Sequence, residues 1–477
     1  MDPGRMMASH ATSRRTSLDS EKETPYTSGP TSEQGGDVEP HEDDDIVRHI
    51  PTHAPHDRDE GGAPLEISFS HLSVPAQPGI PNGGFTAWLQ VACGFFLFFN
   101  SWGLINAFGV WQNYYSTTLI PASSNSTISW IGSIEAFLLC CTTIIAGPLF
   151  DRGYARPMVW AGSLLLVLGL FMTSLCTAYW QLMLAQGLCM GIGAGGLFIT
   201  SVAIIPSYFT TKRAFAMGIA ASGSSLGGVI YPIVFHRLQP QIGFGWATRV
   251  IAFMALATLI LPCLCIRQRA LPPPRKTIID FSGFRELPFC LFSLAAFIGF
   301  IGLYIPFFYI TEFGGEQAGL DSTLAFYMLP VLSAGSIAGR LLPSYTADHL
   351  GPLNVLSLCT VVAGLLGFCW IAVHHTLGGL VVWALLYGAF SGAFVSLQPS
   401  TVVSITDDMS MVGGRLGMNT FCAALGILVG NPIAGVIVGN GSWVGLQAFC
   451  GGTLLAGSVM ILLTRWSRVG WEVQKKA

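Results

Sequence analysis

The stretch YFTTKRAFAMGIAASGSSLGG, residues 208–228, decides the fold of this chain. Small residues recur in it at every fourth position, namely Ala216, Ala220, Ser224 and Gly228. Residues four apart share one face of a helix, and small side chains on that face let two helices approach closely inside a bilayer. The basic pair Lys212-Arg213 precedes the apolar run, where cationic side chains hold a helix end at the cytoplasmic surface. The stretch therefore predicts one spanning helix of a polytopic membrane protein.

The composition of the 477 residues separates a membrane body from a polar tail. Hydrophobic residues make up 51% of the chain, charged residues only 10%, and the mean hydropathy is +0.57. A globular domain in water carries about a quarter charged residues, so most of this chain is suited to lipid. Residues 1–81 hold 15 acidic and 6 basic side chains, whereas the remainder holds 11 acidic and 17 basic ones. All 12 cysteines lie in apolar segments, and we expect small buried hydrophobes rather than disulfides or zinc ligands.

Residues 1–80 are rich in Ser, Thr, Pro, His, Asp and Glu and almost free of aliphatic runs. Such a segment buries too little apolar surface to offset the entropy lost on ordering. No apolar region follows Met1, so the segment does not match a signal peptide. The sequence predicts a disordered, acidic, cytoplasmic tail.

Twelve apolar stretches follow, each long enough to cross a bilayer as a helix, which takes about 20 residues. The longest polar interruption falls in 267–288 and contains three consecutive prolines. We predict an all-α membrane protein with an N-terminal six-helix bundle (81–266), a cytoplasmic linker (267–288), a C-terminal six-helix bundle (289–466) and a short cytoplasmic tail (467–477). The predicted spans are 86–112, 128–147, 158–177, 180–205, 214–235, 246–266, 289–310, 322–343, 354–374, 378–400, 414–438 and 443–465.

Basic residues predict the orientation of these spans. With twelve spans, 14 of the 17 basic residues after residue 81 fall on one side of the membrane, which is expected to be cytoplasmic. Both termini are then cytoplasmic. The loop after the first span faces outward and contains the sequon Asn125-Ser126-Thr127, so Asn125 is a predicted glycosylation site. The cell membrane is the expected location, and the vacuolar membrane is the alternative.

Two motifs carry a resemblance to a known family. The segment before the first span reads Asn82-Gly83-Gly84-Phe85-Thr86-Ala87-Trp88, and the fifth span opens with the stretch quoted above. Together with twelve spans and Asp-Arg-Gly after the second span, they resemble the major facilitator superfamily, and within it the fungal branch of the monocarboxylate porter family. The resemblance covers residues 80 to 466. It implies two six-helix bundles that alternately expose one central site.

The same resemblance bears on the substrate. Animal members carry a buried lysine in the first span, and Asn106 stands at that place here. They also carry an aspartate one turn before an arginine in the eighth span; Arg340 matches the arginine, but Ser336 replaces the aspartate. Binding of a small organic anion by Arg340 is therefore expected, whereas the inherited route for proton coupling is absent. Fungal members also export secondary metabolites, which is the alternative function.

Charged and amide side chains inside the spans are the candidate site residues, because burying them in lipid is unfavourable without a partner. Arg340 would bind a carboxylate in a central cavity; its alternative role is to hold the loop around Asp348. Asn100, Trp102 and Asn106 would line the same cavity, or the two amides would bond neighbouring helices. Glu135, desolvated in a cavity, would exchange protons for coupling; otherwise it pairs locally.

The turns after the second and eighth spans hold Asp151-Arg152 and Asp348, which we interpret as gating residues. Ion pairs there would form in one conformation and break in another. A solvated turn that only sets topology is the alternative for Asp151 and Arg152.

An enzyme is not indicated. Histidines fall only at span ends, and no GxxxxGK[ST] loop appears, so neither catalytic histidine chemistry nor ATP-driven pumping is expected from this chain. No cofactor, metal or nucleic-acid partner is predicted; the expected partners are a small molecule, protons and lipid. A non-transporting nutrient sensor built on a transporter fold is the rival from another class.

Overall fold

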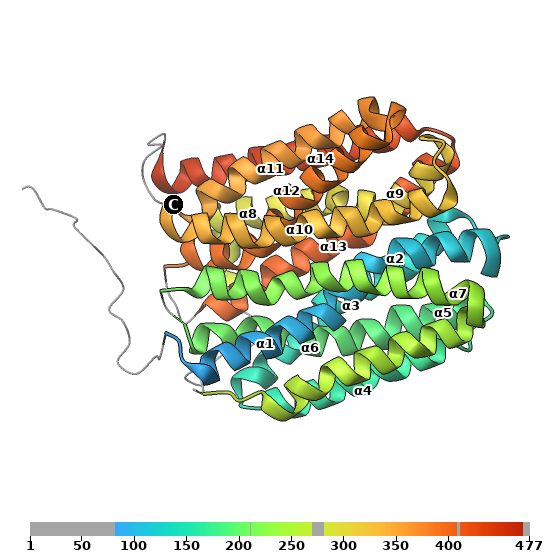
Figure 1. Ribbon diagram of the computed structural model, residues 1–477. Coiled ribbons are helices and arrows are strands. Elements are labelled where there is room, and N and C mark those ends of the chain that lie inside the picture. The colour runs from blue at the N-terminus through green and yellow to red at the C-terminus, as the bar shows by residue number, and fades with distance from the viewer. Residues whose placement is uncertain (1–81, 210, 270–280, 408–410, 471–477) are drawn as a thin grey trace, which may run out of the picture. The chain divides into compact units, whose positions relative to one another are not determined.

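The computed structural model describes residues 82–209, 211–269, 281–407 and 411–470. This part of the chain is helical and contains no strand, as predicted. The predicted tail 1–80, the middle of the linker (270–280) and most of the C-terminal tail (471–477) lie outside the described residues. The helices that build the bundle, drawn in Figure 1, are α1 (Phe85–Asn100), α2 (Trp102–Tyr114), α3 (Asn125–Asp151), α4 (Ala155–Thr173), α5 (Tyr179–Leu182), α6 (Gly191–Ile204), α7 (Arg213–Cys265), α8 (Leu287–Leu303), α9 (Ile305–Glu316), α10 (Ser322–Leu350), α11 (Pro352–Cys369), α12 (Leu377–Ser404), α13 (Val412–Gly439) and α14 (Trp443–Val469).

The predicted number of twelve crossings is reached because α7 contains two of them. Within the described residues, eleven continuous helical segments are long and apolar enough to span a membrane, and α7 is one segment of 53 residues. At 1.5 Å per residue such a helix would measure about 80 Å, far more than a bilayer. Gly243 interrupts it with φ 76° and ψ 168°, and the chain reverses there. The positive φ explains why glycine stands at this turn.

The first span of each half is broken rather than continuous, which the predicted spans 86–112 and 289–310 did not show. Ser101 separates α1 from α2 with φ −83° and ψ −82°, and its hydroxyl donates to the carbonyl of Leu97 at 2.8 Å. Tyr304 separates α8 from α9 because Pro306, two residues on, has no N–H to continue the helical ladder. The two breaks meet: the rings of Trp102 and Tyr304 stack at 5.7 Å.

The fourth span is irregular as well. A π-helical segment, Met183–Met190, lies between α5 and α6, and another, Tyr115–Leu119, follows α2. Single π-helical turns disturb the regular ladder and are frequent at functional sites.

The small residues of α7 allow close contacts with neighbouring helices. In the predicted row, a Cβ added at Gly228 would lie 3.0 Å from Cβ of Asn106 in α2. A Cβ added at Gly223 would lie 2.1 Å from the carbonyl oxygen of Phe95, and one at Gly227 would lie 2.8 Å from Cα of Gly103. A Cβ added at Gly218 would lie 2.7 Å from the carbonyl oxygen of Arg340. Helix α7 therefore lies against α1 and α2 along one side and against α10 along another.

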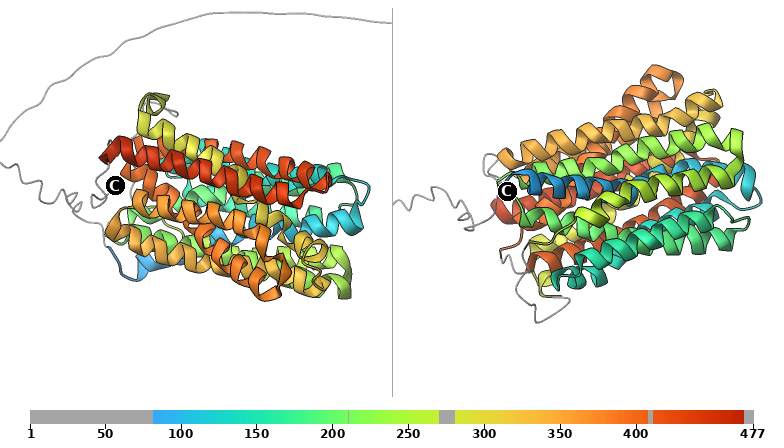
Figure 2. Two further views of the ribbon diagram at one scale, coloured as in Figure 1. Left: turned by 90° about the horizontal axis from the view of Figure 1, so that it is seen from above. Right: turned by 60° about the horizontal axis from the view of Figure 1, so that its bottom comes forward.

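The helices up to α7 (the N-half) meet those from α8 onward (the C-half) along two long contacts. Helix α7 packs against α10, and α3 packs against α13. Both views of Figure 2 show the helices running side by side in one bundle. Any site between the halves is therefore lined by these helices and by the broken first spans.

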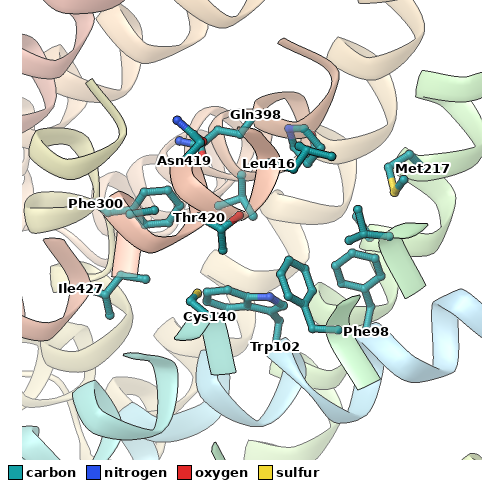
Figure 3. A pocket seen from close by; sticks show the side chains of 17 residues that line it. Phe98, Trp102, Cys140, Met217, Phe300, Gln398, Leu416, Asn419, Thr420 and Ile427 are labelled. Carbon is teal, nitrogen blue, oxygen red and sulfur yellow. The ribbon is translucent and has the colours of Figure 1, made fainter. Parts of the chain in front are cut away.

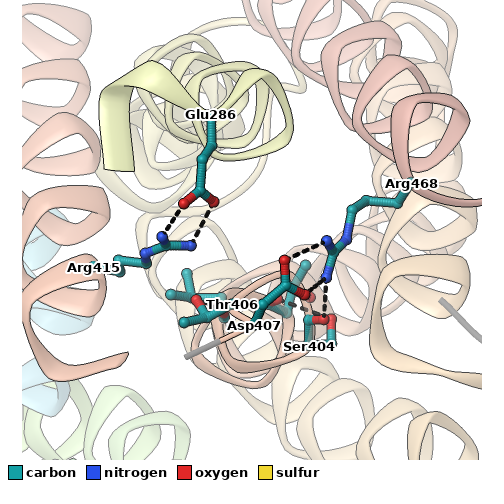
Figure 4. A network of polar contacts seen from close by, with 8 residues as sticks. Glu286, Ser404, Thr406, Asp407, Arg415 and Arg468 are labelled. Carbon is teal, nitrogen blue, oxygen red and sulfur yellow. Dashed lines mark hydrogen bonds and ion pairs between the residues drawn. The ribbon is translucent and has the colours of Figure 1, made fainter. Parts of the chain in front are cut away.

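The ends of the bundle differ in charge. We call the end that holds Arg213, Arg267, Arg415 and Arg468 the basic end; it lies on the left of Figure 1. In the C-half Arg415 pairs with Glu286, and Arg468 donates to Asp407 at 2.8 Å and to the carbonyl of Ser404 at 3.4 Å (Figure 4). These contacts tie α8 to α13 and α12 to α14 at that end.

Candidate functional site

A cavity lies between the halves and is lined by both (Figure 3). Its volume is ≈ 50 Å³, which holds about four water molecules. On α7, α12 and α13 the lining residues lie between the middle of each spanning helix and the basic end. They include Met217, Gln398 and Leu416. The cavity therefore extends from the middle of the bundle toward the basic end.

Aromatic side chains form one wall of the cavity. Phe98 of α1, Trp102 of α2 and Phe198 of α6 come from the N-half, and Phe300 of α8 comes from the C-half. The Phe198 ring meets Phe98 and Trp102 edge-on, at 5.6 Å and 5.7 Å between centroids. Tyr304 lies between Trp102 and Phe300 and stacks on both, so the wall runs without interruption from one half to the other.

Polar side chains form the facing wall and come from the C-half. They are Ser396 and Gln398 of α12 and Asn419 and Thr420 of α13. Asn419 is only 2% exposed, and its Nδ2 has no hydrogen-bond partner; Trp102 is 4% exposed, and its Nε1 likewise has none. Two residues that line the cavity, one from each half, thus carry an N–H donor without a partner.

Of the predicted substrate-binding residues, the structure places only Trp102 in this cavity. Asn100 donates to Thr258 Oγ1 at 2.9 Å and accepts from the hydroxyl of Tyr231 at 2.7 Å. Asn106 donates to the carbonyl of Ser224 at 3.2 Å. Both amides hold helices together, which is the alternative that the sequence left open. The Oδ1 of Asn106 still lacks a partner.

Arg340 lies in the contact between the halves rather than on the cavity wall. The side chain is 2% exposed and projects from α10 onto α7. It donates to the carbonyl of Ala221 at 2.8 Å, to the hydroxyl of Ser224, and to Ser336 on its own helix at 3.3 Å. Ser336, which stands where the related porters have an aspartate, is therefore a hydrogen-bond acceptor for this arginine. In this state the guanidinium fastens α10 to α7.

Glu135 is buried in the N-half, where it is 1% exposed. Its carboxyl group lies beside the side chain of Gln186 in the π-helical segment Met183–Met190, and Gln186 accepts from the hydroxyl of Tyr115 at 2.8 Å. One carboxyl oxygen, Oε2, has no partner. Tyr115 belongs to the other π-helical segment, so both irregular segments meet at this carboxyl. The sequence did not indicate Gln186 or Tyr115.

The predicted gating residues lie at the basic end. Asp151 is the last residue of α3, and Arg152 follows it. Asp348 lies in the last turn of α10, beside the backbone N–H groups of Ala214 and Phe215 in the first turn of α7. A carboxylate there satisfies free helix N–H groups and complements the helix dipole. Asp348 therefore connects the two halves at the basic end.

The opposite end is closed by contacts between the halves. Asn125, at the start of α3, donates to Glu312 of α9 at 2.6 Å, and the next residue, Ser126, donates to the carbonyl of Pro432 in α13 at 3.0 Å. His236 of α7 stacks on Phe326 of α10 at 3.9 Å. The glycosylation predicted for Asn125 stays a prediction, and the atom that would carry the sugar is the one bonded to Glu312.

The sequence analysis does not predict Gln398, Asn419 and Thr420, which are uncharged and lie outside the first span. Each is a polar side chain inside an apolar span, which is the signal that would have found them. Among the described residues, no group of three or more His, Cys, Asp or Glu side chains is placed to hold a metal ion.

Membrane-spanning helices in two halves, with a cavity between the halves, define a multi-pass membrane carrier. Residues 91–387 and 333–477 match the family model of the Major Facilitator Superfamily, and the chain belongs to this family. It is 45% identical over 385 residues to the MFS-type transporter dbaD of Emericella nidulans, covering 80% of this chain and 86% of that protein. It is 40% identical over 408 residues to the agnestins efflux protein of Paecilomyces divaricatus (84% and 92% covered). It is 35% identical over 389 residues to the aspyridones efflux protein of Emericella nidulans (81% and 79% covered). These relatives are named as transporters and not as enzymes; none of them is named a monocarboxylate porter.

Proposed function

We propose that this protein is a secondary active carrier that exports a secondary metabolite by alternating access. The single observation that carries the proposal is the cavity between the halves, which extends toward the basic end while the opposite end is closed. If the basic end is cytoplasmic, as the distribution of basic residues predicts, cargo would enter from the cytoplasm once the halves separate at that end. Two of the relatives are named efflux proteins, which supports the same direction.

Export of a secondary metabolite replaces transport of a small organic anion, of the monocarboxylate type, as our leading interpretation. That interpretation depended on Arg340 as the binding group for a carboxylate. Arg340 instead donates to Ala221, Ser224 and Ser336, and it is not among the residues that line the cavity. A carboxylate that entered this cavity would lose its hydration without meeting a cationic partner.

Glu135 remains our candidate for proton coupling. Its carboxyl is buried, keeps one oxygen without a partner, and is connected through Gln186 to Tyr115. Protonation would remove a charge from the contact between α3 and the π-helical segment. Transport by Glu135→Gln is expected to continue but to become independent of an imposed proton gradient. Equal stimulation of the variant and the wild type by the gradient would reject this role.

Export can be tested before the cargo is identified. Inside-out vesicles from yeast that expresses the carrier are incubated with an extract of fungal culture medium, and the compounds that accumulate are identified by mass spectrometry. We expect at least one compound to be enriched over vesicles without the carrier, and the enrichment to fall when an uncoupler collapses the proton gradient. If no compound accumulates although the carrier is present in the membrane, a sensor that does not transport becomes the better interpretation.

A further inference from the structure

The cavity itself indicates the chemical class of the cargo. We infer that it binds an uncharged aromatic molecule whose oxygen atoms accept hydrogen bonds from Trp102 Nε1 and Asn419 Nδ2. The inference rests on the proposed function, because it treats the cavity as the transport site. It concerns recognition, however, and can be tested without any transport.

The two donors are the first argument. Trp102 Nε1 and Asn419 Nδ2 are buried, belong to two residues that line the cavity, and have no hydrogen-bond partner among the described residues. Buried N–H groups are nearly always paired, so such a donor at a cavity wall marks a place for a water molecule or a ligand acceptor. An indole N–H can only donate. The matching group on the ligand is therefore a carbonyl, ether or hydroxyl oxygen.

The aromatic wall is the second argument. Trp102, Phe198 and Phe300 line the cavity together with Phe98 (Figure 3). Aromatic rings favour edge-to-face or offset contacts with other rings, at centroid distances of about 4.5–7 Å. A planar aromatic ligand in the cavity would add its ring to a wall whose rings already contact one another, from Phe198 through Trp102 and Tyr304 to Phe300.

The absence of charge is the third argument. None of the described residues that line the cavity is Asp, Glu, Lys, Arg or His. Among buried charged side chains, Arg340 donates to Ala221 of α7, and Arg415, which is next to the lining residue Leu416, pairs with Glu286. Glu135 is buried in the N-half and is not among the lining residues. The ligand must therefore enter in an uncharged form, because an isolated ion would lose its hydration without compensation.

The size of the cavity shows how binding is coupled to movement. A volume of ≈ 50 Å³ is far below the roughly 300–1,000 Å³ of ligand pockets. The halves must therefore separate at the basic end before a metabolite enters. Because Trp102 belongs to the N-half and Asn419 to the C-half, a ligand that accepts from both favours their return toward each other.

The test measures binding of two probes of matched shape to the full-length carrier in lipid nanodiscs. One probe is 2-naphthol, which is neutral at pH 7, and the other is 2-naphthoate, which is an anion. We expect 2-naphthol to bind at least about tenfold more tightly than 2-naphthoate. Trp102→Phe keeps the ring and removes the N–H, and Asn419→Leu removes the amide; each should weaken 2-naphthol binding about 5- to 10-fold.

The controls separate recognition from folding. Trp160→Phe changes a tryptophan on the exposed side of α4 and should leave binding unchanged. Thr420→Val provides a second, milder change in the polar wall if Asn419→Leu does not fold, and it should weaken 2-naphthol binding as well. The inference is overturned if 2-naphthoate binds as tightly as 2-naphthol, if neither probe binds, or if the folded wall variants bind like the wild type. Binding with the expected preference but without export in vesicles would reject the proposed function and leave the ligand class intact.

Discussion

Gly109→Ala is the sharpest test of how the opposite end closes. A Cβ added at Gly109 of α2 would lie 2.3 Å from the carbonyl oxygen of Phe307 in α9, whereas ordinary contact begins at 3.4 Å. The two backbones would have to separate by about 1.1 Å, the difference between these distances. The position of the added Cβ is fixed by the backbone of α2, and the atom that it meets is a backbone oxygen of α9. No side-chain rotation can therefore relieve the clash. The methyl group therefore destabilises the closed state and leaves the open state unaffected.

The size of the effect follows from the energetics of overpacking. Forcing one extra methyl group into a packed interface costs about 1–3 kcal/mol. Such an energy shifts the ratio of two conformations about 5- to 150-fold. The expected result is a population of carriers open at the opposite end that is larger by this factor.

Spin labels report the two populations. Cysteines replace Thr118 and Gln317, which are exposed at the opposite end in the N-half and the C-half, in a background with Cys369→Ser. Double electron–electron resonance measures the distance between the two labels. We expect a second, longer distance from carriers that are open at the opposite end, and we expect a larger fraction of molecules at this longer distance in Gly109→Ala than in the wild type. Gly315→Ala, on the facing helix with no neighbour within 4 Å, is the matched control and should behave like the wild type. A Gly109→Ala distribution identical to that of the control would refute the reasoning.

Four further outcomes are expected. Arg340→Gln removes buried hydrogen bonds to Ala221 and Ser224 that are worth about 1.5–3 kcal/mol each, so the melting temperature of this variant in detergent should fall. An unchanged melting temperature together with a loss of carboxylate transport would instead indicate that Arg340 binds substrate. Glu312→Gln should lengthen the contact to Asn125 and raise spin-label distances at the opposite end, and unaltered distances would show that this contact does not hold the end closed. The hydrogen bond from Arg468 lowers the pKa of Asp407. This pair therefore stabilises the fold above the unfolded-state pKa of about 4, and the stabilisation is lost as the pH falls through the lower folded-state pKa. Asp407→Asn should lose less stability between pH 7 and pH 3 than the wild type, and the same loss of melting temperature in both proteins would argue against this role. Deletion of residues 1–75 should leave transport intact, and lost flux at normal membrane levels would assign the tail a function.

The fold was predictable because the apolar stretches that indicate spanning helices repeat along the chain. Length and hydropathy predict the spans, and the four-residue spacing of small residues predicts the close packing of α7. The break at Ser101 was not predicted, because a serine within an apolar run is equally compatible with an unbroken helix. Pro306 in the seventh span, by contrast, does indicate a kink near Tyr304. The contact between Trp102 and Tyr304 also depends on tertiary packing of two segments about 200 residues apart in the sequence.

The site was predictable only in part. The sequence pointed to Trp102 and to the buried positions of Arg340 and Glu135, since polar groups in apolar spans stand out. It did not show which side of its helix each of them occupies. Arg340 turned toward α7 and Asn100 toward Thr258 and Tyr231, so both found partners inside the protein. The polar residues that line the cavity include Gln398, Asn419 and Thr420 instead. Their spacing in α12 and α13 matches no sequence motif that would have indicated a binding site.

The position of Arg340 along α10 has a mechanical consequence. It lies 18 residues from the start of α10 at Ser322 and 10 residues from the end at Leu350, which correspond to about 27 Å and 15 Å. With its bonds to α7 as a fulcrum, a rotation of about 15° would move the far end by about 7 Å and the near end by about 4 Å. The two arms of this lever are unequal, so the same swing opens a wider gate at the end closed by Asn125 and Glu312 than at the basic end.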